Sequence, residues 1–78
     1  MSLYNERIDV RSTNGGHPAL FTWRGDLYRV RRIIGTWDRP ATARLVRVAA
    51  ESSAGTPSIA DIAVDPATHA WTLRRHWS

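Results

Sequence analysis

The chain has 78 residues, no cysteine and a net charge of +4, and all eleven of its basic residues are arginine. Residues 1–78 are expected to form a single domain, because a chain this short buries only about 60% of the surface it exposes when unfolded and cannot support two cores. The missing cysteine excludes disulfides and thiolate metal sites. No apolar run approaches the roughly 20 residues of a membrane-spanning helix, and no secretory signal is recognisable, so we expect a cytoplasmic protein.

The use of arginine alone has two explanations. A GC-rich genome replaces lysine with arginine for no functional reason, whereas a binding site selects arginine because its planar fork grips phosphates and carboxylates. The genomic explanation does not account for the surplus of positive charge over the acidic residues, which points weakly to a polyanionic partner.

The first strand is predicted over Tyr4–Arg11, where Tyr4, Ile8 and Val10 alternate with polar residues. Residues 1–3 are expected to be disordered or left over from expression. Ser12–Pro18 contains two glycines and a proline and is typical of a loop.

Ala19–Ile34 gives the clearest local pattern, since Gly25-Asp26 lies between two strand-like runs. Glycine at the first central position favours a two-residue type II′ turn. That turn would pair Trp23 with Tyr28 and Phe21 with Val30, which sorts aromatic residues to one face and arginines to the other.

The middle of the chain is less clear. Gly35 predicts a bulge or bend before Trp37, and Asp38-Arg39-Pro40 predicts a turn. Residues 43–51 fit either a helix or a strand, and their β-branched side chains favour the strand. Residues 52–57 are expected to form a loop.

Ser58–Trp77 is predicted to form a second hairpin, with a turn that begins at Asp65-Pro66. This turn would pair Val64 with Trp71 and Ile62 with Leu73, and it would set Asp61 opposite Arg74. His69 stands where a residue with positive φ is common. By alternation, Trp23, Trp71 and Trp77 are expected to point into the core.

The expected fold is therefore all-β, with five to six short antiparallel strands in meander order. A sheet with one apolar face is not stable alone in water. We therefore expect the strands to form a small curled sheet or an open barrel, or to pair with a second copy.

Catalytic and metal chemistry are not expected. His17, His69 and His76 have no ligand spacing, the serines lie in loops or near the ends, and a barrel of this size is expected to lack room for a sizeable pocket. We predict a protein that is not an enzyme and binds no cofactor or metal.

The arginines on the polar faces form the one candidate site. A stripe of arginines could contact phosphates, with Trp37 and Trp77 able to stack on unpaired bases. The alternative is a solvated charged face that prevents aggregation. The five candidate arginines are Arg24, Arg29, Arg31, Arg47 and Arg74.

Two separated motifs resemble those of an uncharacterised small actinobacterial domain family. The first, F-x-W-R-G-x-x-Y-R-V, matches Phe21 to Val30, and the second, D-P-A-T-x-x-W-x-L-x-x-x-W, matches Asp65 to Trp77. Members often carry glycine where His69 stands. The resemblance implies a module that accompanies Y-family polymerase-like proteins of mutagenic DNA repair.

Two functions follow as expectations. The first is a non-catalytic accessory module that binds a protein, either a DNA-repair polymerase-like protein or a second copy of itself as a homodimer. The alternative is direct binding of DNA or other nucleic acid through the arginine-rich face.

Overall fold

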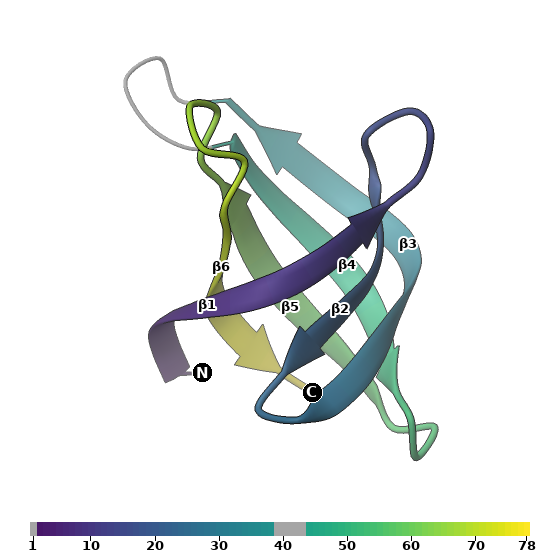
Figure 1. The fold of residues 1–78 in the computed structure, drawn as a ribbon. Helices are drawn as coiled ribbons and strands as arrows, with labels where there is room; N and C mark the ends of the chain where they lie inside the picture. Colours follow the sequence, from purple (N-terminus) through teal and green to yellow (C-terminus); the bar gives the residue numbers. More distant parts are fainter. Residues whose placement is uncertain (1, 39–43) are drawn as a thin grey trace.

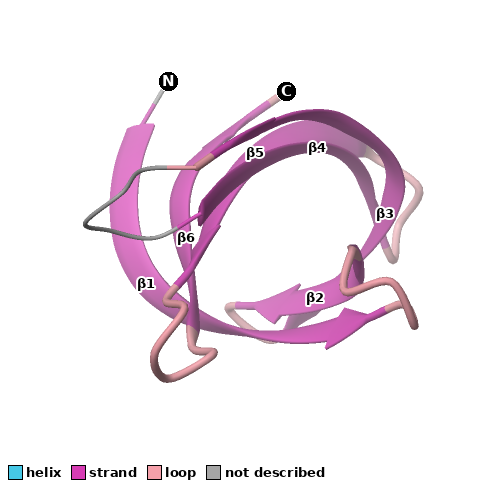
Figure 2. Cartoon of the chain, turned by 90° about the horizontal axis from the view of Figure 1, so that it is seen from above, coloured by secondary structure: helices cyan, strands magenta, loops and turns pink. Residues whose placement is uncertain are grey.

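The computed structural model describes residues 2–38 and 44–78, which form strands and loops only. Six antiparallel strands follow one another in meander order and close into a barrel through pairing of the first with the last (Figures 1 and 2). The strands are β1 (Ser2–Ser12), β2 (Pro18–Trp23), β3 (Asp26–Trp37), β4 (Arg44–Ser52), β5 (Pro57–Val64) and β6 (Trp71–Trp77). The prediction of an all-β meander is confirmed, and the residues from 44 to 51 belong to a strand.

Strand β1 is shared between two neighbours. Its first half pairs with β6, from Ser2 opposite His76 to Ile8 opposite Trp71, and its second half pairs with β2. Ser2 and Leu3 are thus part of the ladder that closes the barrel. No helix in the described ranges is long and apolar enough to cross a bilayer.

The β2–β3 turn lies one residue earlier than predicted, which shifts the strand pairing by two residues. Phe21 pairs with Tyr28 and Trp23 with Asp26, so the turn residues are Arg24 and Gly25, with φ of 51° and 77°. Positive φ at both positions is the type I′ geometry, whose twist matches the flanking strands. Because side chains alternate with a period of two, a shift of two keeps every residue on its predicted face. The predicted register of the β2–β3 hairpin was therefore wrong, but the face predicted to carry the aromatic residues is the buried one.

The β5–β6 hairpin follows the predicted register near its turn and departs from it further on. Val64 pairs with Trp71 and Ile62 with Leu73, as expected, and His69 has a φ of 61°. Asp61, however, pairs with Arg75 because a bulge adds one residue to β6 at Arg74. The predicted pairing of Asp61 with Arg74 is therefore wrong.

Aromatic rings fill the end of the barrel that holds the β2–β3 turn. Phe21 stacks on Tyr28 with ring centroids 4.9 Å apart, and Tyr4 meets Trp23 edge to face at 5.1 Å. His76 lies 4.9 Å from the Trp23 ring. Each such aromatic pair contributes about 0.5–1.5 kcal/mol beyond the area it buries, which suits a chain with a thin core.

Smaller side chains fill the middle of the barrel. Val48, Ala60, Ile62 and Leu73 are fully buried, and Trp71 packs against them while only half-buried. Gly35 lies at a register shift in β3, as predicted. The predicted turn at residues 38–40 lies largely outside the described residues.

Candidate functional site

The outer surface of β3–β5 carries a row of paired positions that includes an ion pair. Gly35 on β3 is opposite Arg47 on β4, which is opposite Asp61 on β5. The guanidinium of Arg47 donates two hydrogen bonds to Asp61, from Nε to Oδ1 at 2.8 Å and from Nη2 to Oδ2 at 3.0 Å. This two-pronged geometry fixes the orientation of the guanidinium plane.

Asp61 is the unusual member of this pair. It points away from the barrel interior, yet only 2% of its surface is exposed. A carboxylate so well covered requires compensation, and Arg47 provides it. The hydrogen bonds to Asp61 raise the pKa of Arg47, although partial burial acts in the opposite direction.

Two tryptophans complete the cluster. The Cζ atom of Arg47 lies 5.4 Å from the ring centroid of Trp37 and 5.1 Å from that of Trp77. Trp37 comes from β3 and Trp77 from β6, so the rings approach Arg47 from strands on opposite sides of β4. We call these four residues, Trp37, Arg47, Asp61 and Trp77, the Trp–Arg surface.

Gly35 creates the space that Trp37 occupies. A Cβ atom at Gly35 would lie 2.9 Å from Cη2 of the Trp37 ring, so any other residue would displace the indole. The ring thus lies across the backbone of its own strand, with 46% of the residue exposed. Gly35, which predicts the bulge, thus also leaves the space in which the indole of Trp37 packs against the backbone.

Trp77 reaches the outer surface because of the bulge at Arg74. Without it, Trp77 would share the inward direction of Trp71 and Leu73, as the sequence analysis expects. The extra residue inverts the alternation, so His76 contacts the core rings of Trp23 and Tyr28 and Trp77 contacts Arg47 instead. The prediction that Trp77 lies in the core is wrong for this reason.

The five predicted arginines do not share one face. Arg29 and Arg31 lie on β3, whereas Arg74 lies on β6, three strands away around a closed six-stranded barrel. Arg24 occupies the β2–β3 turn at the end of the barrel. Of the five, only Arg47 meets both Trp37 and Trp77.

Three of these arginines are engaged by carboxylates. Arg24 donates to Glu6 at 2.6 Å and 3.1 Å, Arg47 donates to Asp61, and Arg31 lies 4.0 Å from Glu51. Neither Arg29 nor Arg74 forms an ion pair within the described part of the chain. The positive charge that a phosphate would meet is thus partly neutralised within the protein.

Glu6 was missed as a structural residue. Its carboxylate accepts hydrogen bonds from Arg24 and from the indole Nε1 of Trp23, and these bonds lower the pKa of Glu6, that from Arg24 most. Its position in the sequence was the available signal, because Glu6 lies between Tyr4 and Ile8 on the apolar face of its strand. A charge in such a row indicates a polar partner nearby.

Comparisons with known proteins give one match. A protein-family model described as "Domain of unknown function (DUF6504)" matches residues 2–78. Neither the curated proteins nor the solved structures include a match to this sequence.

Proposed function

Because the chain belongs to this family of unknown function, we propose its role from the site itself: it is a non-catalytic accessory module that binds a protein partner through the Trp–Arg surface. The observation that carries the proposal is the stacking of an exposed Trp37 and a half-buried Trp77 on one fixed guanidinium. Tryptophan and arginine are the residues most enriched among those that dominate binding energy at protein interfaces.

The surface is organised before any partner arrives. Asp61 holds Arg47 by two hydrogen bonds, and the ring of Trp37 is seated on Gly35. Side chains that are already ordered lose little conformational entropy on binding, so more of the contact energy appears as affinity. Apolar neighbours extend the surface, since Leu45 pairs with Trp37 and Ile59 pairs with Trp77.

The partner we propose is a Y-family polymerase-like protein of mutagenic DNA repair, in the cytoplasm. The support is the resemblance of the Phe21–Val30 and Asp65–Trp77 motifs to modules that accompany such proteins. A protein partner also agrees with the internal neutralisation of Arg24, Arg31 and Arg47.

The test is calorimetry of the purified chain against the polymerase-like protein of the same organism. Trp37→Ala should weaken binding by at least about tenfold, the scale of an interface residue that dominates affinity. Leu27→Ala is the matched control, because Leu27 is also on β3 and is 48% exposed but lies near the opposite end of the strand. Equal affinity of the two variants and the wild type would overturn the proposed surface.

Self-association through the same surface is the second protein-binding mode we propose. Exposed apolar side chains at Ile34 and Trp37 would be covered in a homodimer. Light scattering after size-exclusion chromatography should show a dimer for the wild type and a monomer for Trp37→Ala. A monomer for both at high micromolar concentration contradicts the homodimer.

Nucleic-acid binding is retained as the alternative because of one observation. Arg29, Arg31 and Arg32 are all exposed on β3, and the chain carries a charge of +4. If this face contacts phosphates, affinity for oligonucleotides falls steeply with salt, and Arg29→Ala with Arg31→Ala weakens all sequences alike. No anisotropy change with single- or double-stranded DNA at low salt eliminates the alternative.

A further inference from the structure

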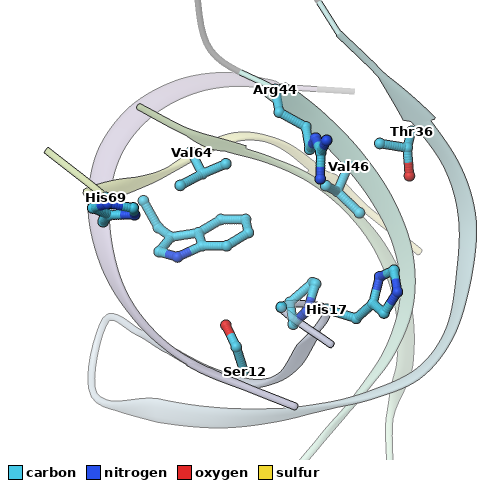
Figure 3. Close-up of a pocket in the computed structure, with 10 residues that line it drawn as sticks. Ser12, His17, Thr36, Arg44, Val46, Val64 and His69 are labelled. Atoms are coloured by element: carbon cyan, nitrogen blue, oxygen red, sulfur yellow. The ribbon is translucent and has the colours of Figure 1, made fainter. Parts of the chain in front are cut away.

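The barrel is hollow at the end opposite the aromatic cluster. A cavity of about 440 Å³ opens there between the β1–β2 loop, the β5–β6 loop and the adjoining ends of β3 and β4 (Figure 3). This volume lies within the range of small-molecule sites, which occur often in the mouths of β-barrels. A pocket at the mouth of so small a barrel was not anticipated from the sequence.

The floor and walls of this mouth pocket are apolar. Val46, Val64 and Trp71 line it, and the indole of Trp71 is the one large flat surface among the lining residues that the structure describes. Trp71 is only half-buried, although it packs against the core. A flat ligand ring entering the mouth can therefore cover apolar surface that the fold leaves open.

The polar residues at the rim are rich in hydrogen-bond donors. Ser12, Thr36, His17, His69 and Arg44 line the opening, and no carboxylate belongs to the described lining. Figure 3 shows His17 and His69 on opposite sides of the opening, with Ser12 and Arg44 across from each other. A rim lined by hydrogen-bond donors favours an anionic group over a cationic one.

Hydrogen bonds outside the pocket position these donors. Asp38 accepts from Nε of Arg44 at 2.7 Å, which orients the guanidinium and leaves its terminal nitrogens to donate elsewhere. The amide of Thr13 donates to the carbonyl of His17 at 2.8 Å. The amide of His69 likewise donates to the carbonyl of Asp65 at 2.8 Å. Both loops are thus closed by their own backbone.

We propose that the mouth pocket binds a flat aromatic ring that carries a phosphate, the chemistry of a nucleoside monophosphate. The ring lies against Trp71, and the phosphate accepts hydrogen bonds from Arg44 at the rim. Two sources offer this chemistry: a free mononucleotide and the 5′-phosphorylated end of a nucleic-acid strand. The pocket is separate from the Trp–Arg surface, so the two proposals stand or fall independently.

The first test is an NMR titration of the ¹⁵N-labelled full chain with adenosine 5′-monophosphate. The amide signals of the two mouth loops and the indole signal of Trp71 should shift together and saturate. Adenosine and inorganic phosphate, each lacking one half of the chemistry, should bind at least about tenfold more weakly, as expected when one charge-assisted contact or one stacked ring is lost. Absence of saturable shifts, or shifts equal to those from phosphate alone, overturns the proposal.

Variants then assign the two halves of the site. Arg44→Gln should weaken binding of adenosine 5′-monophosphate by about tenfold while leaving adenosine unaffected. Arg29→Gln is the matched control, since Arg29 is an exposed arginine on β3 outside the pocket lining. Equal losses from both variants would mean non-specific charge attraction and overturn the site. Trp71→Leu tests the ring contact, and its spectrum shows whether the variant is folded.

A last arm separates the two sources. A short oligonucleotide with a 5′-phosphate is compared with the same strand lacking it and with the free mononucleotide. Tighter binding of the phosphorylated strand than of the mononucleotide identifies a strand end as the ligand, and a mononucleotide that binds when the strand does not identifies the free form. A strand that binds equally with and without its phosphate contradicts the proposal.

Discussion

Nε of Arg47 lies 2.8 Å from Oδ1 of Asp61, and this contact joins an almost fully buried carboxylate to a guanidinium stacked on two tryptophans. The pair lies outside the barrel core, on a surface where most charges are solvated. The ion pair therefore links β4 to β5 and also fixes the position of the guanidinium that the two tryptophans contact.

Arg47→Ala should destabilise the fold, because it removes the two hydrogen bonds that Arg47 donates to the buried Asp61 carboxylate. We expect a loss of about 1–3 kcal/mol in the free energy of unfolding, the scale of lost hydrogen bonds to a charged group. Urea unfolding followed by tryptophan fluorescence measures it. The double variant Arg47→Ala with Asp61→Ala should recover part of the loss, and strictly additive losses would contradict the coupling.

Gly35→Ala should act on the surface more than on the fold. The added methyl displaces the exposed ring of Trp37, so we expect a stability change below about 1 kcal/mol but weaker partner binding and altered tryptophan emission. Gly15→Ala serves as the control, because Gly15 lies in the β1–β2 loop away from the Trp–Arg surface. Unchanged binding by Gly35→Ala would show that the position of Trp37 does not matter.

His69→Gly should stabilise the protein slightly. His69 has a φ of 61°, which costs a non-glycine residue roughly 1 kcal/mol, so relief of that strain should offset the added entropy of the unfolded chain. Thermal unfolding should show a Tm equal to or above that of the wild type, whereas Thr68→Gly lowers it. A clear loss of stability in His69→Gly would indicate that the imidazole itself holds the turn.

His76 should make stability depend on pH in the mildly acidic range. Burial beside Trp23 and Tyr28 lowers the pKa of His76 below its ordinary value of 6.5, and its Nε2 has no hydrogen-bond partner. Below pH 6.5, His76 takes up a proton more readily in the unfolded chain than in the folded chain. The free energy of unfolding therefore decreases as the pH is lowered from 6.5, until the pH passes the folded-state pKa of His76. Above pH 6.5 this contribution is constant.

Urea unfolding between pH 7.5 and 5 measures this slope. His76→Phe should remove the part of it that His76 causes, while His17→Gln, in an exposed loop, should retain it. The lowered pKa of Glu6 adds stability that is present above its ordinary value of 4.5 and lost below it, outside this range. An identical slope in the wild type and His76→Phe would contradict the assignment.

Alternation of apolar and polar residues was enough to predict the strands and their buried faces. It identified Phe21, Trp23 and Tyr28 as core residues even though the predicted pairing of β2 with β3 was two residues off. The sequence pattern could not locate the bulge at Arg74, because a bulge adds a residue without changing composition. For that one reason the predicted core position of Trp77 and the predicted pairing of Asp61 with Arg74 were wrong.

The candidate site was harder to predict because it depends on contacts between distant strands. Trp37 and Trp77 were named as candidates for stacking, although alternation put Trp77 in the core. Their meeting at Arg47 requires barrel closure and the bulge together. The predicted stripe placed Arg29 and Arg74 on one polar side of the sheet, whereas the closed barrel turns them in different directions. The mouth pocket depends on loop shape, which periodicity does not report.

The pairing of Ser2 with His76 has a practical consequence for any attachment to this domain. Both ends of the chain leave the barrel at the end that holds the β2–β3 turn (Figure 1). The residues that line the mouth pocket lie at the other end. An affinity tag, a fluorophore or a fused domain at either terminus therefore projects away from the pocket. Immobilised on a sensor chip by either end, the protein would present its mouth to the solution.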